Sequence, residues 1–75
     1  MNKKRRDEVR QTYAALQKVI FDLKEINDDE QYAYDAIPEN LQDTPKALES
    51  EECIDNLDSA IDSCQEALEY LDEIV

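Results

Sequence analysis

Apolar residues recur at alternating spacings of four and three through the first half of this chain, and this spacing constrains the fold most strongly. It is the heptad pattern of a helix that packs along one side against another helix. The complete line, which we call the seam, is Val9, Tyr13, Leu16, Ile20, Leu23, Asn27, Glu30, Tyr34 and Ile37. The sequence therefore predicts one long amphipathic helix over about residues 4–36.

The same spacing returns in the C-terminal segment, where three tandem heptads read IDNLDSA, IDSCQEA and LEYLDEI. The seam residues there are Ile54, Leu57, Ile61, Cys64, Leu68, Leu71 and Val75. A second apolar line flanks each seam, at Val19, Ile26 and Ala33 and then at Cys53, Ala60, Ala67 and Ile74. The apolar face is thus about three positions wide in every seven, which is more than a strict two-stranded seam requires.

Two prolines set the limits of these segments. Pro38 ends the first, because the residue before a proline is pushed out of the α region. Thr44 and Pro45 supply an N-cap hydroxyl and a proline at the first helical position, so a second helix is expected over residues 45–74. The turn then spans residues 37–44, in which Leu41 is expected to cover the end of the helix pair.

A linker this short returns the second helix antiparallel to the first. The fold class we predict is all-α, with residues 1–75 forming one antiparallel two-helix coiled-coil hairpin. Two helices alone bury little apolar surface. We therefore expect the hairpin to form a homodimer, and so a four-helix bundle, or to lay its remaining apolar strip on another partner.

Composition argues against enzymatic chemistry. The chain contains no His and no Gly, so the usual general bases, phosphate-binding loops and zinc sites lack their residues. The acidic triplet at residues 28–30 has neither EF-hand spacing nor its glycine, so no metal and no other cofactor is expected. No apolar run is long enough for a membrane span. Cys53 and Cys64 lie about 16 Å apart along one helix, beyond disulfide reach, which favours a reduced, cytoplasmic protein.

The charge is large and unevenly distributed. The formal net charge is −12, from 20 acidic and 8 basic residues. Residues 1–24 hold seven basic and three acidic side chains, whereas residues 25–75 hold one lysine and 17 carboxylates. In a hairpin the basic N-terminus would meet the acidic end of the second helix, and excess acid would remain at the turn. Such a surface repels nucleic acid and anionic membranes and attracts basic protein surfaces.

Carboxylates on the second helix also recur at spacings of three and four. They are Glu51, Asp55, Asp58, Asp62, Glu66, Glu69 and Glu73. Neighbouring members lie about 5–6 Å apart on one face, a scale comparable with the phosphates of one DNA strand. A rigid helix with this row could occupy a phosphate-binding cleft as a DNA mimic. The alternative is the solvated outer face of a coiled coil, although such faces usually alternate acidic with basic residues.

The candidate partner-binding residues are the carboxylates nearest the turn together with one aromatic residue. Tyr32 lies off the seam among carboxylates, where an aromatic side chain is a common interface anchor, although an incidental exposed tyrosine is equally consistent. The full candidate set is Glu51, Asp55, Asp58, Asp62, Glu30, Asp28, Asp29 and Tyr32.

The stretch from Tyr34 to Gln42 reads YDAIPENLQ. It resembles a Tyr-Asp-x-Ile-Pro-Glu-x-Leu-Gln turn in small acidic helical proteins of bacterial phages and mobile elements. This resemblance implies a phage origin and action in the host cytosol, where accessory proteins of this size often inhibit a host protein. Two function classes remain: an acidic inhibitor or adaptor that binds a basic, nucleic-acid-binding protein, and a structural bundle without a charged target.

Overall fold

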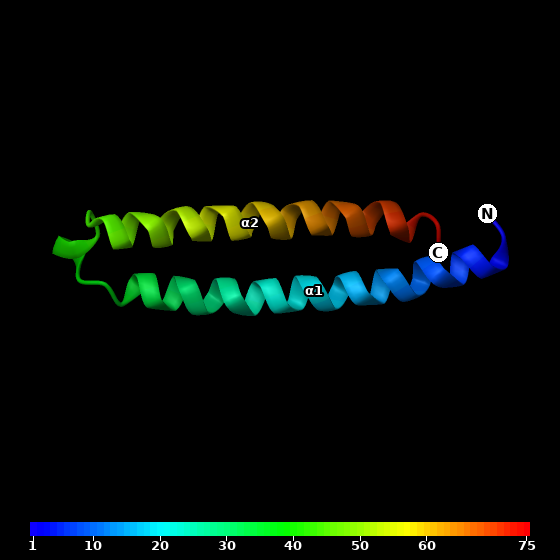
Figure 1. Cartoon of the computed structure of the whole chain (residues 1–75), viewed down its shortest axis with the longest axis horizontal. Helices are drawn as coiled ribbons and strands as arrows, with labels where there is room; N and C mark the ends of the chain where they lie inside the picture. Colours follow the sequence, from blue (N-terminus) through cyan, green and yellow to red (C-terminus); the bar gives the residue numbers. More distant parts are fainter.

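The computed structural model covers residues 1–75 and contains only helices. Helix α1 spans Lys3–Asp35, a short 3₁₀ helix η1 spans Glu39–Leu41, and helix α2 spans Pro45–Asp72. The two long helices lie side by side and antiparallel, in a hairpin measuring 58 × 15 × 13 Å (Figure 1). The predicted all-helical hairpin is confirmed.

Side chains cap both helices at the N-terminal end. The Asn2 side chain accepts a hydrogen bond from the Arg5 amide at 2.9 Å. Thr44 Oγ1 accepts from the Ala47 amide at 3.4 Å, with Pro45 at the first helical position as the sequence predicts. These caps satisfy amides that have no partner within the helix.

The turn contains one element that the sequence analysis did not predict, the 3₁₀ helix η1. Pro38 adopts an extended conformation, with φ −54° and ψ 142°, and so separates α1 from η1. The Leu41 amide donates to the Pro38 carbonyl at 2.8 Å, and the Leu41 carbonyl accepts from both the amide and the hydroxyl of Thr44. Leu41 packs near the end of the hairpin but remains 45% exposed, so it covers that end only in part.

The core is a single line of side chains between the helices. The buried residues are Ile20 of α1 and Ala47, Ile54 and Ile61 of α2. Ala47 continues the seam of α2 towards its N-terminus, through Ser50, by the same spacing of three and four. At the other end the prediction for Val75 was wrong. Because α2 ends at Asp72, Val75 is 40% exposed and its neighbour Ile74 is half-buried instead.

The two polar seam positions of α1 bond across the interface. Asn27 Nδ2 donates to Asp58 Oδ1 at 2.7 Å, and Ser50 Oγ donates to Glu30 Oε1 at 2.5 Å. The second amide atom of this asparagine, Oδ1, is buried without a hydrogen-bond partner. Polar pairs inside a coiled-coil seam lower stability but favour one register. These two bonds therefore specify how the helices align along their length.

The flanking apolar lines are left uncovered. Val19 is 45% and Ile26 54% exposed, while Ala33, Cys53, Ala60 and Ala67 are exposed as well. Ile26 and Cys53 line one shallow groove between the helices, and Ala33 and Cys53 line the next. Both lines therefore lie on the same side of the hairpin. We call Val19, Ile26, Ala33, Cys53, Ala60 and Ala67 the apolar strip.

Candidate functional site

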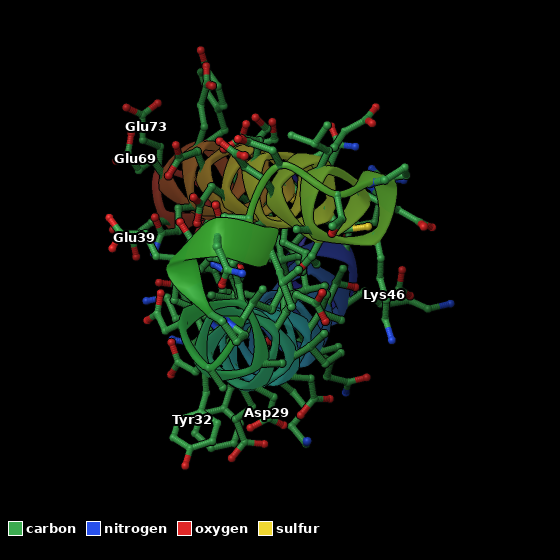
Figure 2. All side chains as sticks on the ribbon, turned by 90° about the vertical axis from the view of Figure 1, so that its left-hand side faces the viewer. Asp29, Tyr32, Glu39, Lys46, Glu69 and Glu73 are labelled. Carbon is green, nitrogen blue, oxygen red and sulfur yellow. The ribbon has the colours of Figure 1, made fainter.

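Helix α2 carries most of its carboxylates on one side. Seven of them step along the helix by three and four residues, and all seven are exposed. We call this set the acidic surface: Glu51, Asp55, Asp58, Asp62, Glu66, Glu69 and Glu73. On the opposite side of α2, the line that flanks the seam through Cys53, Ala60, Ala67 and Ile74 has no charged residue. Figure 2, which looks along the hairpin from the turn, shows Glu69 and Glu73 on one side of α2 and Lys46 on the other.

Four predicted site residues lie on this acidic surface: Glu51, Asp55 and Asp58 in the half nearer the turn, and Asp62 just beyond it. Glu51, Asp55 and Asp62 are exposed and make no hydrogen bond or ion pair with another side chain. Asp58 is exposed too, but it accepts the hydrogen bond from Asn27. Asp58 thus contributes to the register of the helices as well as to the charge of the surface.

The four predicted site residues on α1 do not join the acidic surface as one group. Glu30 is half-buried between the helices and accepts the bond from Ser50. Asp28 and Asp29 are exposed, and Tyr32 is 81% exposed. In Figure 2, Tyr32 and Asp29 point away from α2 on the outer face of α1. A partner seated on α2 alone would therefore not reach Tyr32.

The expected neutralisation of the two chain ends does not occur through ion pairs. The structure has two ion pairs, Arg10–Asp7 and Lys18–Asp22, and both lie within α1. The first turn of α1 extends past the end of α2, so its basic residues have little of α2 opposite them (Figure 1). Hence Glu66, Glu69 and Glu73 stay unpaired and extend the acidic surface beyond the predicted site residues. The sequence signal that identifies these three residues is their spacing of three and four residues from the other members of the row.

The surface offers charge and shape but no assembled reactive group. No three His, Cys, Asp or Glu side chains converge in a metal-binding arrangement. The thiols of Cys53 and Cys64 are both free, the first exposed and the second half-buried. Neither helix has a stretch long and apolar enough to cross a membrane. What the arrangement can do chemically is present a rigid row of carboxylates to a cationic surface.

Comparison of the chain with protein-family models, with curated proteins and with solved structures finds no match.

Proposed function

We propose that this chain is a non-enzymatic accessory protein that binds the basic cleft of a nucleic-acid-binding protein and inhibits it as a DNA mimic. The observation that carries the proposal is the acidic surface, a row of seven exposed carboxylates on one side of α2 with no basic residue among them. The proposal includes a homodimer and action in the bacterial cytosol. It also includes the phage origin that the Tyr34–Gln42 stretch suggests, for example against a host defence system.

The dimensions of the acidic surface suit a phosphate-binding cleft. From Glu51 to Glu73 the helix rises about 33 Å, close to the 34–36 Å of one turn of B-DNA. The row holds about one carboxylate per 5 Å of helix axis, against one phosphate per 3.4 Å along one DNA strand. A cleft that reads phosphates through Lys and Arg would therefore meet most of the charge of one strand over one turn.

Rigidity supports the same proposal. Six of the seven carboxylates sit on a continuous helix of 28 residues and Glu73 is its C-cap residue, so binding would require little ordering of the backbone. A total charge of −12 on 75 residues also speeds encounter with a cationic cleft at low ionic strength. The affinity should accordingly fall as salt rises, because exposed charges are screened over about 8 Å at physiological ionic strength.

A structural bundle without a charged target is the second candidate function. The apolar strip favours it, because an exposed line of Val19, Ile26 and alanines is a packing surface for further helices. In that case the acidic surface would serve as the solvated exterior of the assembly. The two candidates differ in whether the carboxylates near the turn contact a macromolecule.

Affinity capture from a bacterial lysate tests the main proposal when it is followed by two alternative washes. One wash contains duplex DNA and the other contains salt of the same ionic strength without DNA. We expect the DNA wash to release a nucleic-acid-binding protein that the matched salt wash retains, because DNA competes for the same cleft. Release by both washes alike, or retention in both, would contradict the DNA-mimic mechanism.

Charge reversal at Glu51, Asp55 and Asp62 then tests the surface itself. Asp58 is left intact because it bonds to Asn27. The matched control reverses three exposed carboxylates outside the acidic surface, Glu8, Glu25 and Asp43, so both triple variants have a net charge of −6. We expect the first variant to lose capture and the control to keep most of it. Equal behaviour would mean that only net charge matters.

A further inference from the structure

The apolar strip faces solvent along the middle of one side of the hairpin. Its members recur every seven residues on each helix, from Val19 to Ala33 and from Cys53 to Ala67. The grooves that Ile26 and Ala33 line with Cys53 show that the two lines face the same way. Its α2 line consists of Cys53 and two alanines, so another helix could approach closely there. The two lines that contain the strip carry charged residues only near their ends, Arg5 and Lys46. Glu30 and Glu49 line the groove beside Ala33 and Cys53.

The area that the chain exposes is large for its mass. A compact monomer of 8.7 kDa exposes about 4,700 Å² by the usual scaling of accessible area with mass. The hairpin exposes 5805 Å². The excess of about 1,100 Å² is similar to the roughly 800 Å² that each partner buries in a standard interface. Covering one long side of the hairpin would bring the exposed area into the ordinary range.

Charges at both ends of α1 oppose its helix dipole. The first turn has no acidic residue and begins with four consecutive basic ones, and the last turn has no basic residue. Cations at an N-terminus and anions at a C-terminus are each unfavourable. Within the chain no ion pair joins the helices to offset this. If α1 of a second copy lay antiparallel to α1 of the first, the acidic end of each would lie beside the basic end of the other. The unfavourable charges at both ends would then be offset.

The direction of a second copy follows from the charge along the hairpin. The open half, residues 1–22 and 60–75, holds six basic and eight acidic residues. The turn half, residues 23–59, holds two basic and twelve acidic residues. The net charge is therefore −10 for the turn half and −2 for the open half. A parallel dimer would place the two turn halves side by side, whereas an antiparallel dimer places each turn half beside an open half. Repulsion between like charges therefore favours the antiparallel arrangement.

We propose that the apolar strip is the interface with a second copy of this chain, packed antiparallel so that α1 faces α1 and α2 faces α2. The inference rests on the homodimer of the proposed function and specifies its face and its direction. The two acidic surfaces then point outwards on opposite sides of a four-helix bundle. The dimer presents two equivalent binding surfaces that run in opposite directions.

Neighbouring substitutions on α2 test the face. Ala60 belongs to the apolar strip, whereas Ser59 is exposed on the outer side, and Ala60→Glu and Ser59→Glu add the same charge. By sedimentation or light scattering across the micromolar range, we expect the native chain and Ser59→Glu near twice 8.7 kDa. Ala60→Glu should run as a monomer. A monomeric native chain, or two variants with equal dimer affinity, would overturn the proposal.

Spin labels at the turn test the direction, and they leave the proposed interface nearly native. A label on Asn40→Cys, in a chain with Cys53→Ala and Cys64→Ala, marks the turn of each copy. In an antiparallel dimer the labels lie about 50 Å apart, because the hairpin is 58 Å long. Turns packed side by side would give less than about 30 Å, given helix spacings of 8–10 Å. The short distance would overturn the antiparallel arrangement, even if Ala60→Glu also unfolds the chain.

These outcomes are separate from those of the acidic surface. The triple reversal at Glu51, Asp55 and Asp62 changes residues outside the apolar strip. A dimer that captures no nucleic-acid-binding protein would support the interface and contradict the DNA-mimic function. A chain that remains monomeric but captures a nucleic-acid-binding protein would contradict the interface and support the DNA-mimic function.

Discussion

The two long helices share one interface but contribute to it differently. Helix α1 has 33 residues and buries only Ile20, whereas α2 has 28 residues and buries Ala47, Ile54 and Ile61. The seam of α1 includes Asn27, Glu30 and two tyrosines, while the seam of α2 is aliphatic apart from Ser50 and Cys64. The comparison indicates that α2 supplies three of the four buried apolar side chains and that α1 supplies much of the polar specification of register.

Truncation of a buried α2 residue should have the largest effect. Ile61 is 7% exposed, so Ile61→Ala should lower the free energy of unfolding by about 2–5 kcal/mol. Leu16→Ala on the half-buried seam of α1 should cost clearly less. Urea unfolding followed by circular dichroism measures both. A loss below about 0.5 kcal/mol at Ile61 would mean that the seam is not a core.

Replacement of Asn27, one of the two polar seam residues of α1, should instead raise the free energy of unfolding. Asn27→Leu eliminates a buried oxygen without a partner and adds apolar contact, while the exposed Asp58 returns to water. We expect stability to rise by about 1–2 kcal/mol, together with weaker selection of one register. Broader NMR amide signals, or several distances between labels on the two helices, would show this. A destabilised variant that keeps a single register would contradict the assignment.

Loss of an N-terminal cap should lower stability by a smaller amount, and this amount should differ between the two helices. Thr44→Ala should cost about 1 kcal/mol, since Thr44 both caps α2 and bonds to the Leu41 carbonyl. Asn2→Ala should cost less, because Asn2 caps an exposed end of α1 that frays readily. For a domain of this size 1 kcal/mol corresponds to about 4–8 °C in Tm. Equal shifts would mean that the turn does not depend on Thr44.

The smallest effect is expected for the surface ion pair of α1. Lys18 and Asp22 are one turn apart and both are largely solvated, with side chains 68% and 48% exposed. Lys18→Ala should therefore change the free energy of unfolding by about 0.5 kcal/mol or less. The ammonium of Lys18 also lies 5.7 Å from the centre of the Phe21 ring, a contact that adds little at an exposed site. A Tm shift above a few degrees would contradict this view.

Much of the fold could be predicted from periodicity, because the heptad spacing determines which side of each helix is buried. Ile20, Ile54 and Ile61 were all predicted seam positions. Ala47 was not among the predicted seam positions, because a small residue before the first isoleucine gives a weak apolar signal. The prediction that Val75 lies on the seam was wrong for another reason. The last residues lie beyond the end of the helix, so their spacing no longer determines which way their side chains point.

The candidate site was harder to predict than the fold. Net charge along the chain suggested that the ends of the hairpin would pair, but an ion pair depends on side-chain reach and on how far each helix extends. The basic first turn of α1 extends beyond α2, and spacing within one helix cannot show this (Figure 1). Similarly, the position of Glu30 on the seam gave its burial, but not its bond to Ser50 on α2.

The slender shape of the hairpin has a consequence for how the chain folds. Near the turn, Ala33 and Ala47 share a groove and are separated by a short segment, whereas Val9 and Leu71 share a groove at the open end across most of the chain. Loop-closure entropy rises with the length of chain enclosed, so helix pairing should begin at the turn and progress towards the termini. Folding would then start in the half that holds twelve of the carboxylates. Added salt should accelerate this first step by screening their repulsion, even where it changes the final stability little.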